Sequence, residues 1–336
     1  MIPHSQPYIS HNQIDLVNKS LEAAMVSSGA RTMDFEVAHA NLIGKRFGIA
    51  CGSGTQGLVA ILKELNIGKG DEVILPSYVC EKVAEGIIFV GAKPVLCDIE
   101  TSWVMTPNSV RPHISTKTKA IILVHIFGID AWDNNFNKFG VPIIEDICQA
   151  LGRFDGQKGP GSYTDWAFTS FHGTKVITTG QGGMAFSNSI QSSQAIRRTI
   201  KNVFLNDFSD LQAALGLAQL SEFKYILQRR KTISEVYLTQ LPEHLIIETK
   251  NLNTMFFRFP IKFEGDWEII KMAFEQLNIS VRKGVDCTIH GTLGVSKEKF
   301  IETEKIFRST ISLPILPQMT DEDIAAVVKA CKVILC

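Results

Sequence analysis

Short apolar runs alternate with amphipathic stretches over the first half of the chain. The runs are apolar on both faces and lie at residues 46–51, 72–75, 94–97, 120–124 and 142–145. Two of the stretches between them, 55–65 and 81–90, have helical spacing. Strands that are apolar on both faces, each followed by a helix, are typical of a mainly parallel sheet covered by helices on both sides. Two further strands are expected at 166–171 and 183–187.

The pattern changes after residue 210. Apolar residues recur at helical spacing from Leu211 to about Leu241, which predicts one long helix able to bridge two domains. The remainder runs from a strand at 255–259 to a final helix at about 321–333 with Thr320 as its N-cap, and it predicts a small α+β unit. We therefore expect a large domain at 1–235, with an N-terminal arm and helix at 1–30, and a small C-terminal domain at 236–336.

Composition and charge narrow the possible partners. The 34 basic and 34 acidic residues cancel, so nothing in the charge favours nucleic acid. The seven cysteines are scattered without a C-x-x-C pair, which predicts a reducing compartment, no disulfide framework and no metal site. The chain shows neither a signal peptide nor an apolar run of about 20 residues, so we expect a cytoplasmic protein without a membrane partner.

A candidate anion site follows the first of these strands. Ser53, Gly54 and Thr55 lie where a strand ends and a helix begins. Backbone N–H groups and the helix dipole favour an anion at such a place. A Gly-Ser-Gly turn can equally be a purely structural connection, and the full G-x-G-x-x-G pattern is absent.

Two more strand ends carry chemistry. Asp146 follows a very apolar strand, where an unpaired carboxylate is costly, although it can also serve as a helix N-cap. Lys175 follows the strand at 166–171 within hydroxyl-rich and glycine-rich sequence; alone it reads as a solvated lysine, but it can also be a Schiff-base amine. Pyridoxal phosphate (PLP) needs an anion site, an acid for its ring nitrogen and an amine for its aldehyde, and one predicted sheet supplies all three.

At these motifs the chain resembles the DegT/DnrJ/EryC1/StrS sugar aminotransferases, which are fold-type-I PLP enzymes. The resemblance runs nearly end to end, and the stretches that carry it are 52–55, 70–78, 124–128, 145–150, 170–175, 178–183, 211–220 and 312–314. It implies the fold-type-I architecture, a large domain with a mainly parallel sheet and a small C-terminal α+β domain. It also implies a homodimer that moves an amino group from an amino acid, L-glutamate above all, to a keto-sugar on a nucleotide carrier. Such reactions serve cell-surface polysaccharide or secondary-metabolite biosynthesis.

The resemblance also implies a role for each matching residue. Lys175 matches the Schiff-base and proton-transfer lysine, and Asp146 matches the carboxylate that keeps the pyridine nitrogen protonated. Gln149 matches the residue near the phenolic oxygen. The remaining positions assigned to cofactor binding are Gly54, Thr55, Gln56, Cys80, Ser170 and Asn206, of which Gly54, Thr55 and Ser170 match phosphate contacts.

Three stretches depart from the family pattern. Val79 and Cys80 stand where the family has a polar residue and an aromatic that stacks on the cofactor. The aligned stretch 205–208 lacks the family's Asn-Tyr-Arg; Asn206 is a candidate substitute for the asparagine, and the arginine has no counterpart. The segment 281–285 and His290 replace a common Tyr and Pro-Leu-His, and Arg282 or Lys283 is a candidate diphosphate ligand.

Two other functions remain open at this point. Dehydratases of the same family use the pyridoxamine form and replace the lysine by histidine, so Lys175 disfavours that activity. A catalytically silent, PLP-binding regulator is the alternative outside enzymes, supported by the three departures and opposed by the intact Lys175, Asp146 and Gln149. His125 and His172 each follow an apolar strand, and for both we favour a satisfied buried imidazole over a proton-transfer role.

Overall fold

The computed structural model describes residues 1–151, 159–204, 207–247 and 257–336. In these ranges the larger sheet has seven strands in the order β1-β7-β6-β5-β4-β2-β3. Only β7 runs antiparallel to its neighbours, which confirms the mainly parallel sheet predicted from the apolar runs. The strands are β1 (Phe47–Cys51), β2 (Glu72–Pro76), β3 (Lys93–Cys97), β4 (Thr118–Val124), β5 (Ile143–Asp146), β6 (Trp166–Ser170) and β7 (Gly183–Ser187).

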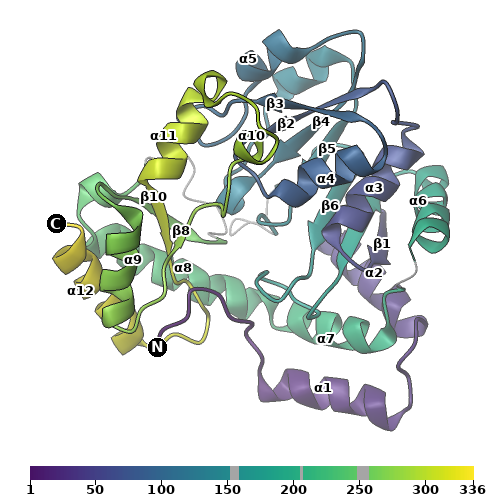
Figure 1. Ribbon diagram of the computed structural model, residues 1–336. Coiled ribbons are helices and arrows are strands. Elements are labelled where there is room, and N and C mark those ends of the chain that lie inside the picture. The colour runs from purple at the N-terminus through teal and green to yellow at the C-terminus, as the bar shows by residue number, and fades with distance from the viewer. Residues whose placement is uncertain (152–158, 205–206, 248–256) are drawn as a thin grey trace.

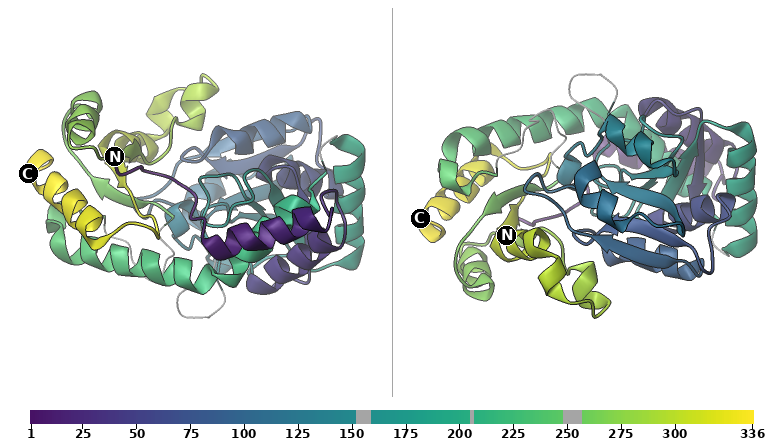
Figure 2. Two further views of the ribbon diagram at one scale, coloured as in Figure 1. Left: turned by 90° about the horizontal axis from the view of Figure 1, so that it is seen from below. Right: turned by 90° about the horizontal axis from the view of Figure 1, so that it is seen from above.

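Helices cover both faces of this sheet (Figures 1 and 2). One face carries α3 (Gly54–Glu64), α4 (Glu81–Phe89) and α6 (Ile190–Val203). The other carries α2 (Ala30–Leu42) and α7 (Asp210–Ser221), and α1 (His11–Glu22) packs on α7. Buried apolar side chains such as Leu58 on the first face and Phe35 on the second form two cores with the sheet between them.

A smaller antiparallel sheet lies on the C-terminal side of the molecule (Figure 1). Its strands are β8 (Phe259–Lys262), β10 (Thr310–Leu313) and β9 (Arg282–Lys283), in that order. The helices α8 (Phe223–Gln240), α9 (Trp267–Gln276) and α12 (Asp321–Ile334) pack around a core that includes Tyr237, Phe259 and Phe274. Thr320 caps α12 through a capping box with Asp323, as the sequence predicts.

The predicted helix over 211–241 is two helices. The chain leaves helical geometry at Glu222, between α7 and α8. The Glu222 carboxylate accepts hydrogen bonds from Ser10, Asn12 and Gln13, so the junction coincides with the place where the N-terminal arm is fixed. Of the strand expected at 255–259, only its last residue begins a strand, and residues 255–256 lie outside the described ranges.

The C-terminal segment does not pack only within its own unit. Helices α10 (Ile289–Thr292) and α11 (Ile301–Ser309) contribute Ile289 and Ile306 to the core under the large sheet, together with Val285 and Phe300. Asp98 accepts N–H groups at the start of α11. The boundary at 235/236 stays a prediction, and the packing shows that residues 285–306 lean on the large domain. The remaining short helix is α5 (Pro107–Val110).

No helix within the described ranges combines the length and the apolar character needed to cross a bilayer.

Candidate active site

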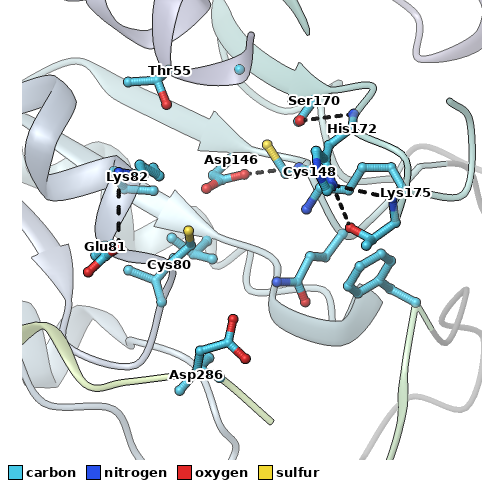
Figure 3. A pocket seen from close by; sticks show the side chains of 18 of the residues that line it. Thr55, Cys80, Glu81, Lys82, Asp146, Cys148, Ser170, His172, Lys175 and Asp286 are labelled. Carbon is cyan, nitrogen blue, oxygen red and sulfur yellow. Dashed lines mark hydrogen bonds and ion pairs between the residues drawn. The ribbon is translucent and has the colours of Figure 1, made fainter. Parts of the chain in front are cut away.

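A cavity of about 570 Å³ opens where the large sheet meets the segment 282–287. Strands β5 and β6 end at it, and α3 and α4 begin at it. Seven of the predicted residues line it together (Figure 3): Gly54, Thr55, Cys80, Asp146, Gln149, Ser170 and Lys175. The strand ends therefore bring these side chains together, as expected for an open α/β sheet.

One end of the cavity is built to receive an anion. Gly54 and Thr55 are the first residues of α3, whose opening N–H groups have no acceptor inside the helix. An added Cβ at Gly54 would lie 3.1 Å from the Ser170 Cβ, so the Ser170 hydroxyl stands beside this helix end. An added Cβ at Gly183 would lie 2.3 Å from the backbone of Ser53, so only glycine lets β7 approach so closely.

Two predicted cofactor contacts are not part of this arrangement. Gln56 does not line the cavity. Its side-chain oxygen accepts the Gly52 N–H at 2.8 Å, and its backbone N–H donates to the Ser53 hydroxyl. Asn206 lies outside the described residues. The motif 52–55 gave no sign that the Gln56 side chain turns back on its own loop.

Asp146 is a buried carboxylate at the end of β5, with 5% of its surface exposed. Its Oδ1 accepts the Cys148 N–H at 2.9 Å, and within the described ranges it forms no ion pair shorter than 4 Å. Burial raises its pKa, although the charge of Lys175 lowers it. Residues 147–151 form no helix, so the N-cap interpretation of Asp146 is wrong.

Lys175 lies in the loop after β6, where its backbone N–H donates to the His172 carbonyl at 2.8 Å. It is half-buried, and its Nζ lies 4.9 Å from the centroid of the Phe257 ring. The amine is thus held against an apolar ring on the cavity wall (Figure 3), unlike a solvated lysine.

Gln149 and Cys80 border the same cavity from different elements. The Gln149 side-chain oxygen accepts the Phe127 N–H at 2.9 Å, so its amide nitrogen remains for a ligand. Cys80 immediately precedes α4, and its thiol is the side chain that this wall offers where an aromatic ring was expected.

The two histidines differ from one another. His125 is fully buried; its Nε2 lies 3.2 Å from Glu145, and its Nδ1 accepts the Ala131 N–H. That is the satisfied imidazole we expected. His172 is exposed at the cavity, with Nδ1 3.0 Å from the Thr174 hydroxyl, so the buried interpretation is wrong for this residue.

Sequence reasoning missed several lining residues on the C-terminal side. Phe257, Arg258 and Asp286 belong to no motif that we used, and only Arg282 was considered. Phe257 and Arg258 precede an ordinary apolar strand, so the sequence holds no local sign that they face the cavity. Within the described ranges, no group of three or more His, Cys, Asp or Glu side chains is arranged to hold a metal ion.

The fold and the site together define a PLP-dependent transferase of fold type I. The model of the DegT/DnrJ/EryC1/StrS aminotransferase family matches residues 7–332, and the chain belongs to this family, whose members are PLP-dependent sugar aminotransferases.

Individual relatives agree with the family assignment. GDP-perosamine synthase from Vibrio cholerae is 31% identical over 260 residues, which are 72% of this chain and 71% of the relative. An uncharacterised protein from Methanocaldococcus jannaschii is 29% identical over 379 residues, covering 99% of this chain and 97% of the relative. Among solved structures, the aminotransferase TlmJ from Streptoalloteichus hindustanus superposes with a TM-score of 0.90 at 21% identity, over 99% of this chain and 98% of that one. A likeness at that identity supports the fold.

The side chains of the cavity fit PLP. The α3 terminus and Ser170 suit its phosphate, and the buried Asp146 carboxylate at the cavity suits a protonated ring nitrogen. Lys175 reaches the same cavity and suits the aldehyde. The donor set thus matches the cofactor of the family group by group.

Proposed function

We propose that this enzyme transfers the amino group of L-glutamate to a keto-sugar carried on a nucleotide. The observation that carries the proposal is the convergence of Lys175, Asp146, Ser170 and the α3 terminus on one cavity of about 570 Å³. A cavity of this size is in the range that binds cofactor-sized and drug-sized ligands. The Vibrio cholerae relative is named for a GDP-linked amino sugar, so GDP-linked keto-sugars are the first acceptors to try.

Each side chain has a defined task in this proposal. When bound, PLP supplies a conjugated ring that withdraws electrons from the substrate carbon. Asp146 holds a proton on the ring nitrogen, and its burial makes that charge pairing strong. The α3 terminus and Ser170 fix the phosphate, so the ring keeps one orientation. Lys175 would hold the cofactor through its Nζ, and the same amine is placed to move the proton at the substrate carbon.

A homodimer in the cytoplasm is the second part of the proposal. Apolar side chains lie exposed on α1 and α2, among them Ile14, Leu21, Met33 and Val37, and their exposure favours a covering surface such as a second copy. Light scattering of the purified protein tests the oligomeric state, and a monomer at all concentrations would contradict it.

The test of the main proposal is the absorption spectrum of the purified protein with PLP, before and after L-glutamate is added. We expect a visible band from bound PLP that glutamate bleaches, and that returns when a keto-sugar nucleotide is added. Lys175→Ala should lack the lysine-dependent band. Lys82→Ala, at a second lysine that lines the cavity and whose Nζ pairs with Glu85 at 2.7 Å, is the matched control and should keep it.

The outcomes separate the alternatives. If PLP binds through Lys175 and no amino acid changes the spectrum, the protein is a silent PLP-binding protein. If PLP does not bind at all, the proposal is wrong at its first step.

A further inference from the structure

Two guanidinium groups line the C-terminal wall of the cavity. Arg258 immediately precedes β8, and Arg282 is the first residue of β9. Within the described residues neither group has a carboxylate within 4 Å, whereas Arg197, Arg229 and Arg308 each pair with an acid. The carboxylate whose charge acts on Arg258 is that of Asp286, on the same wall. Two cations facing a cavity with so little compensation suit an anionic ligand.

The protein holds Arg258 by one side of its guanidinium. Nη1 donates to the Gly284 carbonyl at 2.8 Å and to the Lys283 carbonyl at 3.3 Å. Nε is buried and has no partner, and Nη2 makes no hydrogen bond to any described residue. Nε and Nη2 form the edge of the guanidinium that binds a carboxylate through two parallel hydrogen bonds. That edge is oriented by the protein and left for a ligand.

One aromatic ring connects Arg258 with the reacting amine. The Phe257 ring has Lys175 Nζ 4.9 Å from its centroid and the Arg258 guanidinium carbon 5.5 Å from it. The amino nitrogen of a donor has to arrive where Lys175 acts, and an α-amino acid carries its carboxylate on the adjoining carbon. Both cations contact the Phe257 ring and line the same cavity, so the Arg258 guanidinium lies in the part of the cavity where that carboxylate arrives.

His4 lies near the same arginines. It is buried, with its Nε2 2.8 Å from the Ser312 hydroxyl. Burial lowers its pKa, and the charges of Arg258, Arg282 and Arg230 lower it further. The arginine charges therefore act in the same direction as burial at this residue.

We propose that Arg258 binds the carboxylate of the amino donor side-on, and that Arg282 adds positive charge at the same wall. The inference rests on the proposed aminotransferase function and names the residue that selects its donor. It also gives a use to Arg258 in a chain whose stretch 205–208 lacks the arginine usual in the family. Here the cation comes from the small sheet of the same chain.

The experiment separates the two halves of the reaction. Arg258→Met should raise the L-glutamate concentration for half-maximal bleaching of bound PLP about tenfold to a hundredfold, as expected for losing charge-assisted hydrogen bonds. Arg258→Lys should fall between the variant and the wild type, because an ammonium cannot make the two parallel bonds. Bleaching by an amino-sugar nucleotide, with GDP-perosamine tried first, should change by less than about twofold, since that donor has no carboxylate.

Binding supplies a readout that does not depend on turnover. Titration calorimetry with glutarate, a dicarboxylate without an amine, should show weaker binding to Arg258→Met than to the wild type, with PLP affinity unchanged. Arg308→Met is the matched control, because Arg308 is exposed and pairs with Glu304 away from the cavity. Circular dichroism shows whether each variant is folded. If Arg258→Met is not folded, Arg258→Lys, which keeps the positive charge, takes its place in the titration.

Three results would overturn the inference. The first is an Arg258→Met protein with wild-type dependence on glutamate, which leaves the aminotransferase proposal intact because the wild type still reacts. The second is loss of GDP binding with glutarate binding retained, which would assign Arg258 to the phosphates of the acceptor. The third is a pair of findings. If L-glutamate bleaches bound PLP in neither the wild type nor Arg258→Met, the aminotransferase proposal is wrong. If both proteins also bind glutarate equally well, the Arg258 proposal is wrong on its own evidence.

Discussion

Two neighbouring carboxylates on strand β5 lie in different hydrogen-bonding environments. Glu145 and Asp146 are adjacent on the strand, so their side chains point to opposite faces of the sheet. The Glu145 carboxylate accepts N–H groups from Gly161, Tyr163 and Thr164 and lies 3.2 Å from His125 Nε2. Asp146 accepts the Cys148 N–H, lies beside the Cys148 thiol and lines the cavity.

The pKa values of the two carboxyls move in opposite directions. Burial alone would raise both, and it does raise that of Asp146. At Glu145 the hydrogen bonds, first that from His125 and then that from the Gly161 N–H, outweigh burial and lower the pKa. The protein's own donors satisfy the buried Glu145 carboxylate, so that charge contributes to the fold. The buried Asp146 carboxylate keeps acceptor capacity at the cavity, so it is available to a ligand.

The largest expected effect is that of Asp146→Asn on activity. Removing the charge that holds the ring proton should lower kcat about a hundredfold or more. The raised pKa has the opposite consequence for stability. The ionised carboxylate is less favourable in the folded than in the unfolded state, so its cost is present at neutral pH and disappears below the pKa of the unfolded state. The PLP-free variant should therefore melt higher than the wild type at neutral pH, and the gap should close in acid.

Kinetics and thermal melts of the same two proteins test this pair of effects. A variant that loses activity and also melts lower would mean that Asp146 contributes to the fold in the way Glu145 does.

Glu145→Gln should reverse this result. Both carboxylate oxygens face only donors, so the amide NH₂ of glutamine has to oppose at least two of them, and we expect a loss of about 3 kcal/mol in the free energy of unfolding. Because the folded-state pKa of Glu145 is lowered, its stabilisation is present above the unfolded-state pKa and is lost as the pH falls through the folded-state value. Urea unfolding from neutral to acidic pH measures this, and the activity of the folded fraction should be retained.

The sequence predicted one wall of the site much better than the other. Asp146 and Ser170 end two neighbouring parallel strands, and Lys175 follows the second of them. Parallel strands end on one edge of a sheet, so sequence order alone brings these residues together. Phe257 and Arg258 reach the cavity from another sheet. Their placement depends on how the two sheets pack, which no local pattern encodes.

The same limit applies within the fold. The interruption at Glu222 rests on contacts with Ser10 and Asn12, more than 200 residues away in the sequence, so helical spacing alone predicted one continuous helix. The capping box at Thr320 is local, and it was predicted correctly.

Cys80→Tyr sharpens the comparison on the ligand side. The thiol offers less area to a ring than an aromatic side chain does, so adding an aromatic at this position should tighten PLP binding about tenfold. Fluorescence titration of the PLP-free protein with PLP measures the change. Cys336→Tyr, at an exposed cysteine that does not line the cavity, is the matched control and should bind as the wild type does. Equal affinities in all three proteins would mean that Cys80 does not face the ring.

The smallest effect concerns a buried polar group that faces neither a partner nor the cavity. His39 is fully buried, neither ring nitrogen has a hydrogen-bond partner among the described residues, and its ring lies 5.0 Å from that of Phe171. Burial lowers its pKa to about 3, so it stays neutral in the folded protein while it gains a proton in the unfolded chain below about pH 6.5. On account of this group, the free energy of unfolding of the wild type should therefore fall by about 1.4 kcal/mol for each pH unit below that value.

His39→Leu should raise the free energy of unfolding by about 1 kcal/mol at neutral pH and by more in acid. Urea titrations at pH 7.5 and 5.5 measure the free energy of unfolding of both proteins. If His39→Leu is more stable than the wild type by the same amount at both pH values, the protonation of His39 does not change on folding. Unlike a change at Asp146, His39→Leu should leave the affinity for PLP unchanged, because His39 does not line the cavity.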